Sequence, residues 1–229
     1  MNTARLPSRR SLILGFALIA ITASGYWALN TGQQRGSAPP SEIQDQVYWQ
    51  PREIGAFTLT RAGAEGFGPS SLRGKWTFLF FGYTHCPDVC PSTLAVLGQV
   101  FRRIDEDPGR AGVTQALLVS VDPRRDTPQA LAEYVRFFHE RFVGATGSTE
   151  ALDTLTRQIG VTYSIQAPAP GAAPEHYQVA HSATIFLIDP LGRLLARFPP
   201  PHDAGEIAES FARVRAYFEE RTGKRWGLF

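Results

Sequence analysis

The sequence predicts an α/β domain in which helices cover a mixed sheet. Short apolar runs such as 76–81, bounded by turn residues, alternate with stretches whose apolar residues recur every three or four positions. Near the C-terminus, apolar runs at 183–188 and 194–198 flank the turn sequence 189–192 and predict a hairpin. A hydrophobic content of 43% with 19% charged residues is typical of a folded domain and excludes a wholly disordered chain.

Each element is predicted by an apolar run, by helical spacing of apolar residues, or by turn residues. In chain order they are a strand at 57–60, a glycine-rich turn through Gly68, a turn at 71–75, a strand at 76–81, a helix at 91–104, a strand at 113–121, a helix at 127–138, a short helix at 152–159, a loop at 166–175, the hairpin strands at 183–188 and 194–198, and a final helix at 207–218. This order, with two cysteines after the first central strand, is typical of a thioredoxin-like fold.

The N-terminal residues predict a membrane anchor. Arg9 and Arg10 precede residues 11–29, which carry no charge, and nineteen residues at about 1.5 Å each nearly span the hydrocarbon core of a bilayer. The arginines are expected to stay in the cytoplasm, which sends the rest of the chain outward. A cleaved signal peptide is the alternative, but its small-residue site at 22–25 is weak.

These features predict four segments. Residues 1–10 form a basic cytoplasmic N-terminus, 11–29 a single-pass transmembrane helix in the inner membrane, 30–46 a linker, and 47–229 a domain in the periplasm. Of the 23 basic residues, three lie in the first 29, and the other 20 are balanced by 21 acidic residues. The domain therefore shows no sign of a nucleic-acid surface.

Cys86 and Cys90 are the only cysteines, and they lie where the strand at 76–81 gives way to a helix. A helix N-terminus is expected to lower the pKa of a thiol and to favour the thiolate. Positions four apart on a helix have Cβ atoms about 5–6 Å apart, which is wide for a disulfide at about 3.8 Å. A metal ion with bonds of about 2.3 Å to sulfur bridges that separation, so the spacing favours a metal without excluding a redox pair. A purely structural disulfide would close too short a loop to stabilise much.

Two thiolates are too few for a structural zinc site, whereas Cu(I) accepts two or three sulfur and imidazole ligands. Among five histidines, His181 lies between a long loop and the strand at 183–188, from which it can reach the cysteine loop. His85 is adjacent to Cys86 and is expected to point elsewhere, and His176 is at most an accessory ligand.

Two acidic residues follow the strand at 113–121. Asp122 either lies near the cysteines and tunes their protonation, as a second-shell residue, or serves as a turn or capping residue before Pro123. Asp126 is expected to cap the helix that begins at Pro128.

Three segments together resemble the Sco/SenC family of copper proteins: 80–91 with both cysteines, 121–128 (Val-Asp-Pro-Arg-Arg-Asp-Thr-Pro), and 181–190, which begins with His181. The resemblance covers residues 45–220 and implies a thioredoxin-like fold. It implies that Cys86, Cys90 and His181 bind copper as Cu(I), and it leaves open whether they also bind Cu(II). It further implies a metallochaperone rather than an enzyme, which receives copper from a donor protein and serves the CuA centre of cytochrome c oxidase subunit II.

Other functions use the same residues. A membrane-tethered thiol–disulfide reductase of the subunit II cysteines would use Cys86 and Cys90 as a redox disulfide and carry no metal. A peroxidase, by analogy of fold, would need an arginine such as Arg124 or Arg125 and leaves His181 unexplained. A sensor of copper or redox state is the third alternative.

Overall fold

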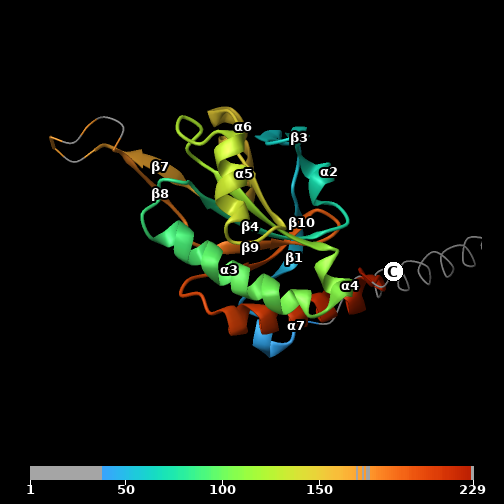
Figure 1. Ribbon diagram of the computed structural model, residues 1–229. Helices are drawn as coiled ribbons and strands as arrows, with labels where there is room; N and C mark the ends of the chain where they lie inside the picture. The colour runs from blue at the N-terminus through green and yellow to red at the C-terminus, as the bar shows by residue number, and fades with distance from the viewer. Residues whose placement is uncertain (1–37, 169, 172, 174–175, 228–229) are drawn as a thin grey trace, which may run out of the picture. The chain divides into compact units, whose positions relative to one another are not determined.

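The computed structural model describes residues 38–168, 170, 171, 173 and 176–227 of the 229-residue chain (Figure 1). The predicted transmembrane helix at 11–29 lies outside these residues. Within the described part, no helix combines the length and apolar character needed to cross a bilayer.

The centre of the domain is a mixed six-stranded sheet (Figure 1). In spatial order its strands are β1 (Val47–Glu53), β10 (Arg193–Phe198), β9 (Ile185–Ile188), β4 (Trp76–Gly82), β5 (Thr114–Ser120) and β6 (Phe142–Ala145). The last three are parallel, and each pairing from β4 through β9 and β10 to β1 is antiparallel. The mixed sheet and its four apolar strands are thus confirmed, whereas β1 and β6 were not predicted.

In the described part of the chain, four long helices and three short ones accompany the sheet. The long helices are α3 (Val89–Asp105), α5 (Pro128–Arg136), α6 (Thr149–Ile159) and α7 (Ala204–Thr222), and the short ones are η1 (Ser41–Ile43), α2 (Pro69–Leu72) and α4 (Pro108–Ala111). Helices α3 and α7 lie side by side in Figure 1. Both pack on the face of β4 that carries Trp76 and Phe78, since Trp76 contacts Phe211 of α7 and Phe78 contacts Phe101 of α3, each with ring centroids 5.6 Å apart.

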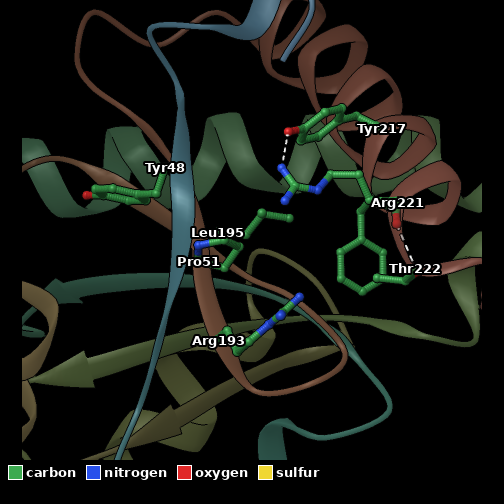
Figure 2. A pocket seen from close by; sticks show the side chains of 8 residues that line it. Tyr48, Pro51, Arg193, Leu195, Tyr217, Arg221 and Thr222 are labelled. Carbon is green, nitrogen blue, oxygen red and sulfur yellow. Dashed lines mark hydrogen bonds between the residues drawn. The ribbon is translucent and has the colours of Figure 1, made fainter. Parts of the chain in front are cut away.

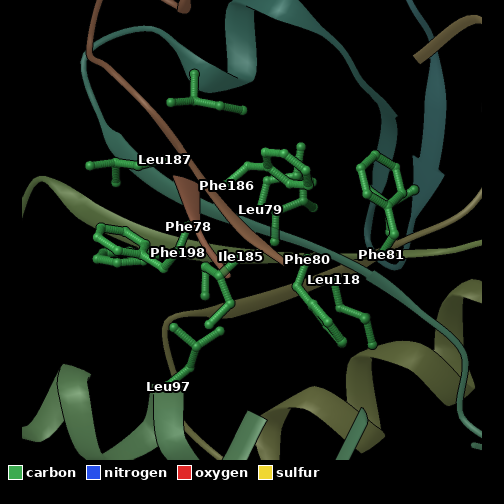
Figure 3. Packing of buried hydrophobic residues seen from close by; sticks show 14 of the residues in the cluster. Phe78, Leu79, Phe80, Phe81, Leu97, Leu118, Ile185, Phe186, Leu187 and Phe198 are labelled. Carbon is green, nitrogen blue, oxygen red and sulfur yellow. The ribbon is translucent and has the colours of Figure 1, made fainter. Parts of the chain in front are cut away.

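Strands β4 and β5 are buried along their whole length, which explains the apolar runs at 78–81 and 116–119. Figure 3 shows side chains of β4 pointing to both sides of the sheet, with Phe80 beside Leu118 of β5. Because β4 is fixed on both faces, its C-terminal end at Gly82 gives the cysteine loop a rigid base.

Two smaller sheets differ from the sequence predictions. The stretch predicted as a turn through Gly68 contains β3 (Ala64–Phe67), which pairs with β2 (Leu59–Arg61). The predicted loop at 166–175 connects β7 (Tyr163–Gln166) and β8 (Gln178–His181), which form a hairpin that extends from the body of the domain (Figure 1). Ile43 of η1, within the stretch predicted as a linker, is fully buried in the core.

Candidate metal centre

The two cysteines lie on either side of the start of α3. Cys86 belongs to the loop between β4 and α3, and its N–H donates to the carbonyl oxygen of Tyr83 at 3.3 Å. Cys90 lies in the first turn of α3 and is fully buried, whereas Cys86 is partly exposed. Both thiols are free, and the N–H of Cys90 donates to the Sγ of Cys86 at 3.4 Å.

His181 ends β8 and completes a cluster of three soft donor atoms. Its Nε2 lies 3.3 Å from the Sγ of Cys90, and the two sulfurs and this nitrogen all lie within 4.8 Å of one another. Nδ1 donates to the carbonyl oxygen of Ser182 at 3.1 Å. Because a carbonyl only accepts, Nδ1 carries the proton, and the lone pair of Nε2 faces the thiols. The structure therefore brings the three predicted ligands together.

The protonation states differ from the sequence prediction in one respect. Burial raises the pKa of the Cys90 thiol, and the neighbouring Cys86 and Asp126 raise it further. The prediction of a lowered pKa is wrong for Cys90, because removing the sulfur from water outweighs the helix N-terminus. Burial also lowers the pKa of the His181 imidazole, which keeps it neutral and able to bind a metal.

Asp126 holds the cysteine loop instead of capping a helix. Its carboxylate accepts hydrogen bonds from the N–H of Thr84 at 2.9 Å, the hydroxyl of Thr84 at 2.5 Å and the hydroxyl of Ser120 at 2.5 Å. The cap of α5 is Thr127, whose hydroxyl accepts from the N–H of Ala130. The predicted role of Asp126 is thus wrong: its side chain turns inward and ties the start of the loop to β5.

Asp122 contacts the hairpin that carries His181. Its carboxylate accepts from the hydroxyl of Tyr177 at 2.6 Å and from Nε of Arg125 at 2.5 Å. Its backbone carbonyl accepts from the N–H of Arg125 and so forms a turn. The side chain therefore contacts the residue that precedes β8, and the backbone forms the predicted turn.

Sequence reasoning missed Gly82, Tyr83, Arg125 and Tyr177 as residues that support the site. The signal for Gly82 is a glycine at the end of a buried strand, which often marks a close approach. His85, as predicted, points away from the thiols, with Nδ1 at 3.0 Å from the hydroxyl of Thr84. Within the described part of the chain, His85 and His176 lie outside the donor cluster.

Two cavities show how the site differs from the rest of the surface. One of about 260 Å³ opens onto Cys86 and His181 and is also lined by Tyr83, Val89 and Val179. The other, of about 170 Å³, is lined by residues of β1, β10 and α7, including Arg193 and Arg221, and contains none of the predicted ligands (Figure 2). Of these two cavities, only the first reaches Cys86, and Cys90 lines neither of them.

A thioredoxin-like α/β fold that carries two thiols after its central strand β4, with an imidazole from the β7–β8 hairpin beside them, defines a class of redox and metal-binding domains. Residues 47–216 match the family described as SCO1/SenC, and the chain belongs to this family.

Known proteins agree with this assignment. "Protein SCO2 homolog, mitochondrial" of Bos taurus is 35% identical over 215 residues, which are 93% of this chain and 78% of the relative. "Protein SCO1 homolog, mitochondrial" of Homo sapiens is 40% identical over 164 residues, which are 71% of this chain and 53% of the relative. The crystal structure of Arabidopsis thaliana ScoI with copper bound superposes with a TM-score of 0.64 at 34% identity, and the match covers 71% of this chain and 98% of that one.

Proposed function

We propose that this protein binds copper as cargo through Cys86, Cys90 and His181 and takes part in the assembly of cytochrome c oxidase. The observation that carries the proposal is the convergence of two sulfurs and the unprotonated Nε2 within 4.8 Å. Two metal–sulfur bonds of about 2.3 Å span about 4.6 Å, so one ion can join these atoms after small movements. Thiolate and imidazole ligands select Cu(I), and the Arabidopsis relative was solved with copper.

The proposed acceptor is the CuA centre of cytochrome c oxidase subunit II. Family membership supports this acceptor, and the exposure of Cys86 supports the direction of approach. An incoming cysteine or histidine can reach Cys86 through the 260 Å³ cavity, while Cys90 stays buried. The charge-free stretch at 11–29 supports an anchor in the inner membrane with the domain in the periplasm.

The second candidate is a thiol–disulfide reductase of the subunit II cysteines. It is favoured by the difference between the two thiols: Cys86 is partly exposed and accepts an N–H bond, whereas Cys90 is buried. In this reaction the Cys86 thiolate attacks a target disulfide and releases one target thiolate. The Cys90 thiolate then attacks the Sγ of Cys86, which leaves a Cys86–Cys90 disulfide and a fully reduced target.

The two candidates are separated by copper binding to the full chain in detergent with reduced thiols. The variants are Cys86→Ser, Cys90→Ser and His181→Ala, and His176→Ala on the same hairpin is the matched control. The proposal expects about one copper per chain with sulfur and nitrogen neighbours in X-ray absorption, altered in the first three variants and unchanged in the control. Absence of copper together with a readily reversible Cys86–Cys90 disulfide would establish the reductase instead.

Delivery needs a separate measurement. Copper-loaded protein is mixed with the copper-free soluble domain of subunit II, and the metal content of both is measured after they are separated. Transfer to the acceptor supports the chaperone function, and retention of copper by the donor contradicts it.

A further inference from the structure

His181 does not belong to a strand of the central sheet, although its ring packs against Phe80 of β4 with the ring centroids 5.8 Å apart. Strands β7 and β8 form a sheet of their own, and residues 182–184 connect His181 to β9. An extended connection of three residues spans about 10 Å. This connection alone would let His181 move much farther than the 3.3 Å that separates its Nε2 from the Sγ of Cys90. Side-chain contacts must therefore help to place the imidazole.

Asp122, Arg125 and Tyr177 provide such contacts and are called the hairpin clamp below. Nε of Arg125 donates to Oδ2 of Asp122 at 2.5 Å, and Nη1 of Arg125 donates to the carbonyl oxygen of Tyr177 at 3.1 Å. The Tyr177 hydroxyl donates to Oδ1 of Asp122 at 2.6 Å. The clamp thus fastens residue 177, just before β8, to the segment that follows β5.

The guanidinium of Arg125 also links the hairpin to the cysteine loop. Its Cζ lies 3.7 Å from the ring centroid of Tyr177 and 5.5 Å from that of Tyr83. The Tyr83 hydroxyl in turn accepts the N–H of Val179, two residues before His181, at 3.3 Å. Arg125 therefore contacts the end of β5, the cysteine loop and the hairpin at once.

These contacts are strong because they are shielded from water. The side chain of Asp122 is fully buried and that of Arg125 is 15% exposed. A planar guanidinium that pairs with a buried carboxylate and stacks on an aromatic ring is held in one geometry, which a lysine cannot reproduce. Other contacts hold the hairpin as well, including the bond from the hydroxyl of Tyr163 to Asp153 at 2.8 Å. Loss of Arg125 should therefore loosen the hairpin without unfolding it.

We propose that Arg125 is a positioning residue of the metal centre: through the hairpin clamp it holds the His181 imidazole within bonding distance of a metal on Cys86 and Cys90. The expected effect of Arg125 on copper binding rests on the proposed function. The contacts of the hairpin clamp, however, are present in the copper-free chain. Without Arg125, the site becomes a pair of thiolates whose imidazole is no longer held.

The test compares Arg125→Ala with Arg124→Ala in the full chain. Arg124 is the adjacent, exposed arginine and is the matched control. In copper-free protein, amide hydrogen exchange in β8 should become at least tenfold faster in Arg125→Ala, while exchange in β4 and β5 stays as in wild type. With Cu(I) bound, X-ray absorption should lose nitrogen scattering and keep sulfur scattering, and copper affinity should fall by about 10–100-fold.

Arg125→Lys gives a second, milder variant, which keeps the charge without the planar fork. It should give intermediate exchange and remains informative if Arg125→Ala does not fold. Unchanged β8 exchange and unchanged nitrogen scattering in both Arg125 variants would overturn the proposal. If the wild-type chain binds no copper, the proposed function fails, and β8 exchange alone then decides whether the clamp holds the hairpin.

Discussion

The sulfur of Cys90 packs directly against the backbone of Gly82. A Cβ placed on Gly82 would lie 2.8 Å from the Sγ of Cys90, a separation that real Cβ atoms essentially never show. It would also lie 3.1 Å from the ring of Phe80 and 3.2 Å from Cδ1 of Leu118. The missing side chain at the end of β4 therefore creates the space in which the buried thiol sits.

Gly82→Ala should displace the Cys90 thiol. Because the surrounding core is closely packed, we expect the free energy of unfolding to fall by about 1–3 kcal/mol. We also expect faster reaction of Cys90 with a thiol reagent, measured by mass spectrometry after partial modification. Gly112→Ala is the control, since its Cβ would approach no atom closer than 3.7 Å. If Cys90 in Gly82→Ala reacts with the reagent as fast as in wild type, the added methyl group does not displace the thiol, and the prediction is wrong.

Asp126→Ala should release the loop before Cys86. The change leaves the N–H and hydroxyl of Thr84 and the hydroxyl of Ser120 without their acceptor, at a cost of about 3 kcal/mol in unfolding free energy. Urea unfolding measures the cost. Asp88→Ala changes an exposed residue of the same loop whose carboxylate accepts from the hydroxyl of Ser92 at 3.3 Å, and it should cost less than about 1 kcal/mol. Equal costs for the two variants would contradict the role given to Asp126.

Asp189→Ala should destabilise the domain without changing the thiol cluster. The buried carboxylate accepts from the N–H groups of Leu191 and Arg193 and pairs with the Arg193 guanidinium at 2.8 Å. Removal of one partner of such a pair costs about 3–5 kcal/mol, which urea unfolding can measure. Asp107→Ala, a more exposed helix cap, should cost only about 1 kcal/mol. An altered reactivity of Cys86 in Asp189→Ala would contradict the expectation that the contacts of Asp189 do not affect the thiol cluster.

Tyr163 should make stability fall at alkaline pH. Burial and the hydrogen bond to Asp153 raise the pKa of Tyr163 to about 12, above the value of 10.0 for a free tyrosine. The folded chain therefore keeps a proton that the unfolded chain loses. The contribution of this group is complete below pH 10 and is lost as the pH rises through about 12.

Urea unfolding of wild type and Tyr163→Phe between pH 9 and pH 11.5 measures this contribution. The phenylalanine cannot ionise, so the variant should be less stable at pH 9 and should lose less stability as the pH rises. Parallel pH profiles for the two proteins would show that Tyr163 does not contribute.

Burial along a whole strand is what made the central sheet predictable. Strands β4 and β5 each contain a run of four consecutive apolar residues, 78–81 and 116–119, and that pattern can be recognised without knowing the partner strand. The β7–β8 hairpin was missed because most of its residues are exposed and its strands pair across a long loop. Sequence periodicity carries little signal for strands of this kind.

The donor residues were predictable, but the residues that hold them were not. Cys86, Cys90 and His181 stand out by chemical type and by resemblance to a family. Arg125 and Tyr177 are 52 positions apart in the sequence, and a contact over such a distance cannot be recognised from the local sequence pattern. The sequence Asp-Thr-Pro at 126–128 equally fits a cap by its first or second residue, and only burial shows that Asp126 turns inward. The raised pKa of Cys90 has the same origin, since depth of burial is a property of the folded chain.

The separation of the three donors along the chain also has a consequence for folding. The two thiols come from one junction between a strand and a helix, whereas His181 follows Cys90 by 91 positions. Contacts between neighbours in sequence form early, and contacts across long loops form late. A chain that has folded only its first half contains both thiols but lacks the imidazole, and so presents a bare dithiol. A complete set of donors therefore marks a molecule whose C-terminal half has already closed onto the sheet.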